Sequence, residues 1–226
     1  MYGNQQQNTL VVTEFLDWDT DTVRKYTEKV VGTELDPVQQ AIKLFYAVRD
    51  KIRYDVYGVD MSRCGLRASS IIENGAGFCI HKSIVFAAAV RSLGIPSRLV
   101  FSDVRNHIST PALKKLVGSD VFHYHAYAEI LLEGRWVKAT PVFNLMLCRL
   151  FGIEALEFDG IRDATLQPFD KDGNKCLEFI EYHGTFDDVP YRECIAALKH
   201  HHPLLFLEGG KTARGNLSKE INLQIA

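Results

Sequence analysis

The sequence predicts an α+β fold in which a buried helix carries Cys79 at its N-terminus and packs on an antiparallel β-sheet. The first observation is the segment 79–93, which is almost wholly apolar and follows a glycine-rich turn. A helix that is apolar on every side belongs inside a core. The second observation is a pair of aromatic-rich runs, 122–132 and 135–141, on either side of Glu133-Gly134. Such runs indicate a β-hairpin with a two-residue turn.

The composition is typical of one soluble globular domain, with 46% hydrophobic and 24% charged residues among 226. We expect a single domain over 1–226, with a core at about 40–145, an N-terminal helical extension and a C-terminal extension over 146–226. A net charge of −2 leaves no electrostatic footprint for nucleic acid or an anionic membrane. No apolar run approaches the roughly 20 residues that span a bilayer. We therefore expect a cytoplasmic protein, and the sequence leaves its oligomeric state open.

The N-terminal elements follow from local signals. Residues 1–8 are expected to fray, and the apolar run 10–16 is expected to form a strand. Thr20 or Asp21 caps a helix that ends near Gly32. Pro37, which follows Asp36, suits the first position of a second helix with an apolar stripe. The polar segment 51–75 is expected to be a loop with one short strand at 52–56.

The elements after the cysteine helix are predicted in the same way. Gly94 ends that helix, 97–102 is the next strand, and 103–120 is an insertion with a short helix at 112–117. The segment 151–160 is expected to dock on the core, and 170–174 to be a hairpin turn before a strand at 175–182. A helix begins at Pro190, and its residues 200–202, all histidine, are expected to be a solvated cap. A polar tail follows Leu207.

Cys79 is the candidate nucleophile. The first turn of a helix offers unpaired N–H groups and the positive end of the dipole, which both favour a thiolate and should lower the thiol pKa. The same N–H groups can form an oxyanion hole. The alternative is an inert buried cysteine. The five cysteines are irregularly spaced without a CxxC pattern, which favours reduced thiols, and Cys64 is expected to be structural.

The predicted hairpin carries the candidate base. Pairing residue 132 with 135 places His125 on one face of the sheet with Thr140 diagonally across from it. His123 lies two residues before His125 and should point to the same side of the strand. A zinc site formed by Cys79, His123 and His125 is therefore an alternative.

Four sequence motifs together resemble the core of the transglutaminase-like superfamily over roughly 40–145. They are Gly-Phe-Cys at 77–79, the apolar helix ending in Leu-Gly-Ile-Pro-Ser-Arg at 93–98, His-Ala-Tyr-Ala-Glu at 125–129 and Gly-Arg-Trp-Val at 134–137. This superfamily is related in fold to papain-like cysteine proteases, and it includes transglutaminases, peptide N-glycanases and many microbial proteins assigned as cysteine proteases. The resemblance implies a papain-like, transglutaminase-core fold.

The resemblance also implies roles for individual residues. Cys79 corresponds to the nucleophile and His125 to the general base, whereas the family's third catalytic residue, an aspartate, is Thr140 here. Family members often present an aromatic side chain to the oxyanion site from the region before the nucleophile, and we expect Tyr54 in that place rather than Tyr57. Phe78 and His123 are expected to line the cleft.

Thr140 changes the chemistry of the expected site. An aspartate fixes the histidine tautomer and stabilises the imidazolium, whereas a threonine hydroxyl can only orient the ring. Asn144 and Asp159 are alternative third members.

We expect thiol acyl transfer on an amide or peptide bond of a peptide or protein, without a cofactor, and hydrolysis by a protease, amidase or deamidase. Amine transfer by a transglutaminase, or a catalytically weakened or inactive peptide-binding module of the same fold, are the alternatives.

Overall fold

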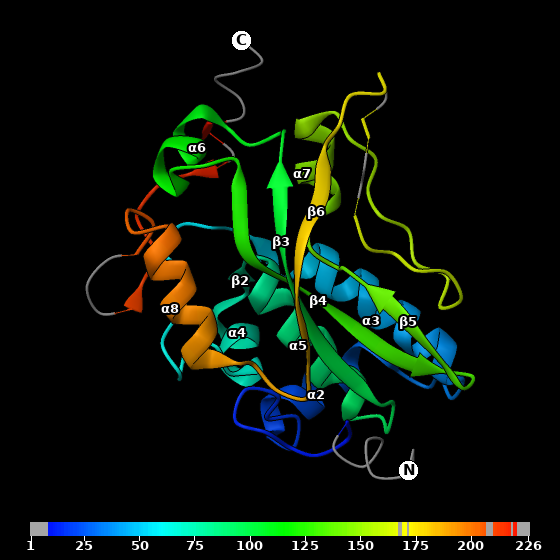
Figure 1. Ribbon diagram of the computed structural model, residues 1–226. Helices are drawn as coiled ribbons and strands as arrows, with labels where there is room; N and C mark the ends of the chain where they lie inside the picture. Colours follow the sequence, from blue (N-terminus) through cyan, green and yellow to red (C-terminus); the bar gives the residue numbers. More distant parts are fainter. Residues whose placement is uncertain (1–8, 167–168, 171, 207–209, 218, 221–226) are drawn as a thin grey trace.

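The structure is a computed structural model that describes residues 9–166, 169–170, 172–206, 210–217, 219 and 220. It has two layers, a four-stranded antiparallel sheet and a group of helices on one of its faces (Figure 1). The strands lie in the order β5-β4-β3-β6, with bounds Arg135–Ala139, Val121–Leu132, Ser97–Asn106 and Leu177–Phe186. This arrangement confirms the α+β class predicted from the sequence. The expected frayed terminus at 1–8 lies outside the described residues.

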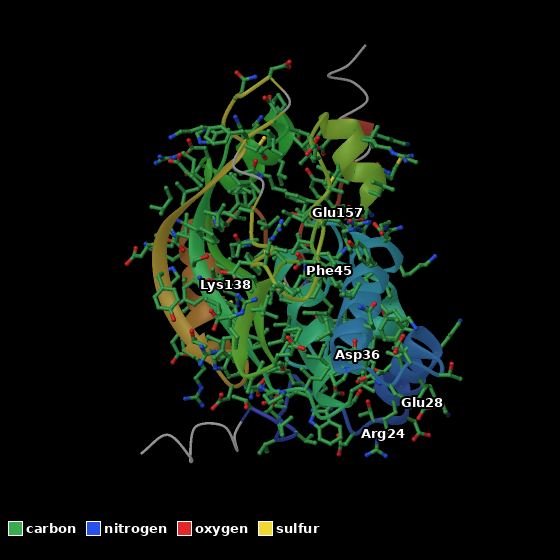
Figure 2. The ribbon with its side chains drawn as sticks, turned by 90° about the vertical axis from the view of Figure 1, so that its right-hand side faces the viewer. Arg24, Glu28, Asp36, Phe45, Lys138 and Glu157 are labelled. Atoms are coloured by element: carbon green, nitrogen blue, oxygen red, sulfur yellow. The ribbon has the colours of Figure 1, made fainter. Side chains whose placement is uncertain are left out.

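Four helices form the second layer: α2 (Asp21–Val31), α3 (Pro37–Lys51), α4 (Ala68–Asn74) and α5 (Cys79–Arg91). Three others, α6 (Pro111–Val117), α7 (Leu145–Phe151) and α8 (Tyr191–His201), lie around the sheet (Figure 1). A short parallel pair, β1 (Arg53–Tyr54) and β2 (Ala76–Gly77), leads into α5. Viewed from the side in Figure 2, Lys138 lies on the sheet and Phe45 lies in the interior. Arg24 and Glu28 lie on α2, at the edge of the helical layer.

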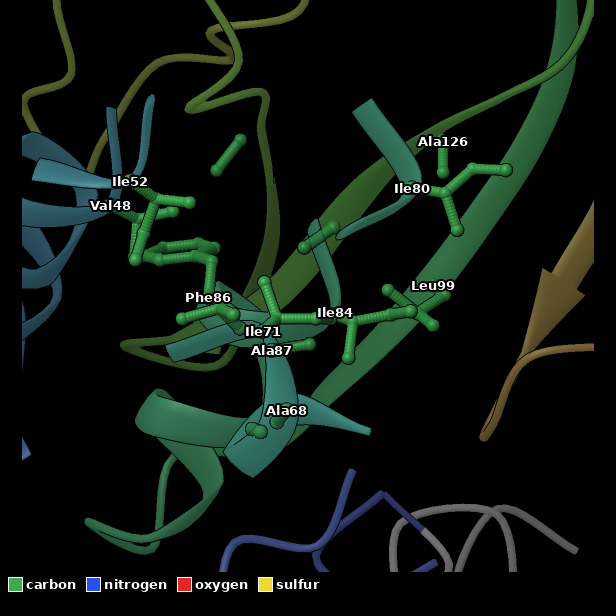
Figure 3. Packing of buried hydrophobic residues seen from close by; sticks show 14 of the residues in the cluster. Val48, Ile52, Ala68, Ile71, Ile80, Ile84, Phe86, Ala87, Leu99 and Ala126 are labelled. Carbon is green, nitrogen blue, oxygen red and sulfur yellow. The ribbon is translucent and has the colours of Figure 1, made fainter. Parts of the chain in front are cut away.

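Helix α5 lies at the centre of the core. Every residue from Ile80 to Arg91 is buried, as the apolar sequence predicted. In Figure 3, Ile80 and Ile84 extend toward Ala126 and Leu99 of the sheet. The buried amine of Lys82 donates to two backbone carbonyls, Arg49 O at 2.8 Å and Ile52 O at 2.7 Å, which lie at the end of α3. These hydrogen bonds satisfy a polar group in the core.

The predicted local signals for the helix starts and the hairpin are confirmed. Thr20 Oγ1 accepts from Val23 N, and the side chain of Asp36 accepts from Gln39 N with Pro37 in the first turn. Leu132 pairs with Arg135, and the turn residues Glu133 and Gly134 have φ values of 48° and 79°. Two consecutive positive φ values are typical of the type I′ turn that suits the twist of a hairpin.

Three predictions of secondary structure are wrong. Residues 10–16 form turns rather than a strand, although Phe15 and Leu16 are buried. The segment expected to be mostly loop contains α4, whose seven residues are too few for a clear periodic pattern. Strand β3 continues through Asn106, so Asp103 belongs to the sheet and not to an insertion.

The described part of the C-terminal segment differs from the expectation as well. His202 is almost fully buried rather than solvated. Residues 207–209 lie outside the description, but Gly210 O accepts from Met61 N, and Thr212 and Leu217 are buried. This segment therefore packs on the body of the protein instead of forming a free polar tail.

Strands β3 and β4 contain a bulge that the sequence did not predict. Ser102 pairs with His125 and Val104 pairs with Phe122, so two residues of β4 lie opposite Asp103 alone. Tyr124, one of these two, has a φ of 54°. A left-handed backbone at a bulky residue is costly, and bulges re-aim side chains next to functional sites. The simple alternation of faces along β4 is broken between His123 and His125.

Candidate active site

A tight turn between α4 and α5 places Cys79 at the first position of α5. Helix α4 ends at Gly75, whose φ is 64°, and Gly77 then pairs with Tyr54 in the short parallel ladder. A Cβ at position 77 would lie 2.3 Å from the Cβ of His81, so the chain has room only for glycine there. The sequence signal Gly-Phe-Cys thus reflects a steric requirement of the turn that places the cysteine.

Two residues of α5 hold β4 beside the thiol. The backbone N–H of Ala126 acts on the Cys79 thiol and lowers its pKa, and Ser83 Oγ donates to Ala126 O at 2.9 Å. Because His125 directly precedes Ala126, these interactions fix the strand that carries the imidazole against the start of the cysteine helix. Cys79 and His125 line one cavity.

The environment of the sulfur differs from the sequence expectation. Burial raises the pKa of the Cys79 thiol to about 11, although the N–H groups of Ala126, Ile80 and Cys79 itself act in the opposite direction. The first turn of the helix therefore does lower the pKa, but by less than desolvation raises it. The resting side chain is a neutral thiol surrounded by oriented N–H dipoles.

The cavity at Cys79 is narrow, with a volume of about 50 Å³ and mainly apolar walls. Tyr54, Phe78 and His123, the three residues expected in the cleft, all line it. Burial raises the pKa of Tyr54, and the nearby Cys79 thiolate would raise it further. Tyr57 lies elsewhere, with its hydroxyl 2.7 Å from Glu220 Oε1. The described end of the chain also contributes to the cavity through Leu198, His202 and Leu205.

His125 and Thr140 meet at a second, smaller cavity but form no hydrogen bond with each other. Among the described residues, neither His125 Nε2 nor Thr140 Oγ1 has a hydrogen-bond partner, and both atoms are buried. Burial lowers the pKa of His125 to about 4. The imidazole is therefore neutral at physiological pH, and nothing in its described surroundings stabilises an imidazolium.

The two alternative third members serve other purposes. Asn144 caps α7, with its Oδ1 accepting from Leu147 N at 2.9 Å. Asp159 lies in a surface turn, where its Oδ1 accepts from the N–H groups of Ile161 and Arg162. Both residues follow rules of local capping and turn formation, and neither forms a described hydrogen bond with His125.

Sequence reasoning missed a carboxylate close to the site. Asp103, 4% exposed, bonds to His123 Nδ1 at 2.6 Å and to His183 Nε2. Asp103 was not recognised because the sequence placed it in an insertion. Its contacts also depend on the bulge, which is not evident from the sequence, and on β6. Within the described ranges, no group of three or more His, Cys, Asp or Glu residues is arranged to hold a metal ion.

The family model of the transglutaminase-like superfamily matches residues 24–141, just over half of the chain. This chain belongs to the transglutaminase-like superfamily. The matched region ends one residue after Thr140 and contains the whole of α5, β3, β4 and β5. The family predicted from four short motifs is thereby confirmed.

Two solved structures are similar to part of the chain. One is described as a "putative cysteine protease" from Cytophaga hutchinsonii, with 18% identity and a TM-score of 0.47 over 62% of this chain and 43% of that one. The other is described as a "putative protease" from Parabacteroides distasonis, with 7% identity and a TM-score of 0.39 over 60% of this chain and 26% of that one. This chain thus corresponds to less than half of either protein. No curated protein matches it in sequence. No helix within the described residues is long and apolar enough to cross a membrane.

Proposed function

We propose that this chain is a cysteine enzyme that hydrolyses an amide or peptide bond of a peptide or protein by thiol acyl transfer at Cys79. The observation that supports this most is that Cys79 and His125 line one cavity, where the backbone N–H groups of Ala126, Ile80 and Cys79 itself act to lower the pKa of the thiol. These donors suit a thiolate and the oxyanion that forms when a carbonyl is attacked.

The proposed reaction starts from a neutral pair rather than a preformed ion pair. His125 accepts the Cys79 proton as the sulfur attacks the carbonyl carbon, and it returns that proton to the nitrogen of the leaving amine as the C–N bond breaks. The products of this half-reaction are a Cys79 thioester and a free amine. Water then cleaves the thioester to release a carboxylic acid and restore the thiol.

Hydrolysis and amine transfer can be separated in one assay. The protein is incubated with a mixed peptide digest in H₂¹⁸O, with and without a fluorescent primary amine. Mass spectrometry then scores ¹⁸O in new carboxyl groups against amine adducts. We expect ¹⁸O-labelled products from wild type and from the Cys64→Ser control, and none from Cys79→Ala. Equal products from wild type and Cys79→Ala would contradict the proposal.

A second candidate, a peptide-binding module without turnover, is favoured by one set of observations. The Cys79 thiol has a raised pKa, and His125 Nε2 lacks a partner within the described structure. For such a module, native mass spectrometry should detect peptides retained by wild type while no ¹⁸O enters any product.

A further inference from the structure

The β3–β4 bulge places His123 against a buried carboxylate. Asp103 Oδ1 accepts from Tyr124 N at 3.1 Å and from His183 Nε2, while Asp103 Oδ2 lies 2.6 Å from His123 Nδ1. The two oxygens of the carboxylate therefore accept hydrogen bonds from three donors on two strands. The strained φ of 54° at Tyr124 occurs at the residue that makes this arrangement fit.

The carboxylate is ionised at neutral pH. Burial alone would raise the pKa of Asp103, but the hydrogen bonds from His183 and Tyr124 N and the charges of the two imidazoles outweigh it, and the pKa is lowered. An ionised carboxylate only accepts hydrogen bonds, so His123 carries its proton on Nδ1. The lone pair that can act as a base is then on Nε2.

His123 is held in this orientation by α8. Its backbone N–H donates to His202 Nε2 at 3.1 Å, and His202 Nδ1 donates to Val117 O. The ring of His123 stacks on that of His201, with centroids 3.7 Å apart. Its titratable surroundings among the described residues are Asp103 from β3, Tyr124 from β4, His183 from β6, His201 at the end of α8 with His202 directly after it, and Tyr54, Cys79 and His125 of the shared cavity.

His123 and His125 differ in their hydrogen-bond partners. Both line the cavity at Cys79, but the side chain of His123 is 21% exposed and has an anionic partner. His125 has a buried Nε2 without a partner in the described structure. His123 therefore has a carboxylate that fixes the orientation of its ring, whereas His125 has no such partner among the described residues.

We propose that His123, oriented by Asp103, is the general base that activates water for hydrolysis of the Cys79 thioester. This step rests on the proposed function. His123 Nε2 takes a proton from water as the oxygen attacks the thioester carbonyl carbon. The C–S bond then breaks, the thiolate recovers the proton from the imidazolium, and a carboxylic acid leaves. His123 acts on a reacting atom, and Asp103 is a positioning residue.

The test measures the lifetime of a thioester on the whole protein. Brief treatment with p-nitrophenyl acetate acetylates thiols, and after removal of the reagent peptide mass spectrometry follows the loss of acetyl from each cysteine. The thioester on exposed Cys64 is the internal reference. We expect the Cys79 thioester of wild type to hydrolyse at least about a hundredfold faster than that of Cys64, as general base catalysis supplies factors of about 10²–10⁴.

Four variants separate the roles. His123→Ala should slow loss of acetyl from Cys79 about a hundredfold, and Asp103→Asn at least tenfold. Asp103→Asn should also move the midpoint of the pH–rate profile roughly one unit or more toward acid, because a neutral amide stabilises the imidazolium less. Asp103→Glu should keep the midpoint close to that of wild type. The matched control is His107→Gln, a histidine that pairs with Glu178 outside the cavity and should change the rate less than threefold.

Each outcome decides between the two claims. Fast hydrolysis at Cys79 that survives His123→Ala but is lost in His125→Ala overturns the inference and leaves the proposed function standing. If Cys79 takes up no acetyl, or its thioester is no shorter-lived than that of Cys64, both the proposed function and the inference fail. If Asp103→Asn does not fold, the rate measured for His123→Ala decides whether His123 is the base. If Asp103→Asn folds and hydrolyses the thioester more slowly but with an unchanged pH midpoint, the proposed role of the carboxylate is refuted.

Discussion

Replacing Thr140 with aspartate would introduce the carboxylate that the resemblance to the superfamily implies at this position. Thr140 is buried, its hydroxyl has no described partner, and it shares a small cavity with His125. Aspartate and threonine have similar volumes, so the variant changes mainly charge. We expect the new carboxylate to accept from His125 Nε2–H and to stabilise the imidazolium, which raises the pKa of His125.

The magnitude follows from the two pKa values of the pair. Burial raises the pKa of the Cys79 thiol to about 11 and lowers the pKa of the His125 imidazole to about 4. Transfer of the proton from sulfur to nitrogen therefore costs roughly 9–10 kcal/mol, of which the attraction between the two resulting charges returns about 4 kcal/mol. A neighbouring carboxylate raises the pKa of an imidazole by about 1–3 units. The population of the thiolate–imidazolium pair should then rise about 10- to 1000-fold.

Alkylation by iodoacetamide at pH 6 measures this population. At that pH few Cys79 thiols lose their proton to solvent, so the ion pair dominates the rate. Site-resolved mass spectrometry should show Cys79 of Thr140→Asp reacting at least about tenfold faster than wild type, with exposed Cys64 unchanged as the reference.

The matched control for this prediction is Thr140→Asn, which can orient the ring without charge and should change the rate less than threefold. Its melting temperature and that of Thr140→Asp show whether the buried side chain is accommodated, because an unpaired carboxylate would cost several kcal/mol. Equal rates in two folded variants would refute the view that a missing charge at position 140 keeps the pair neutral.

Two further predictions concern the helix that carries the nucleophile. Burial lowers the pKa of Lys82 from 10.5 to about 7, so between these pH values the unfolded chain binds one more proton at this residue, and the contribution of Lys82 to stability should rise with pH by about 1.4 kcal/mol per unit. Urea unfolding from pH 7 to 10 should show this slope in the difference in stability between wild type and Lys82→Met, because the thiols with raised pKa values act equally on both; the same pH dependence in both proteins would contradict the assignment. Gly77→Ala should abolish acetylation of Cys79 by p-nitrophenyl acetate because its Cβ collides with His81, whereas Gly75→Ala, with nothing within 4 Å, should cost only about 1 kcal/mol in thermal unfolding and keep the reaction. Retained reactivity in Gly77→Ala would show that the turn can adjust.

Much of the scaffold could be predicted because it depends on neighbours in sequence. Thr20 and Asp36 cap their helices through N–H groups three residues away, and Glu133-Gly134 fixes the hairpin register through its own φ values. The all-apolar character of 80–91 requires burial wherever the helix lies. The position of Cys79 at the start of that helix followed from the same local patterns.

The protonation and the hydrogen-bond partners of the site residues depend on tertiary structure. The expected low pKa of Cys79 came from its helix, but the thiol pKa follows from how completely β4 and the end of the chain enclose it. The side chains of Asn144 and Asp159, which the sequence offered as alternative third members, form a helix cap and a turn. Desolvation depends on all the atoms around a group, so no single segment encodes it.

The sequence by itself determined the fold class, the superfamily and the elements that bring Cys79 and His125 to one cavity. The tertiary structure alone decided that both are neutral and that the buried carboxylate of Asp103 lies beside His123 rather than His125. The physical reason is that the helix, the hairpin and their caps arise from periodicity and backbone geometry within a few residues. A bulge between strands and the charge of a buried group are set by residues distant in sequence.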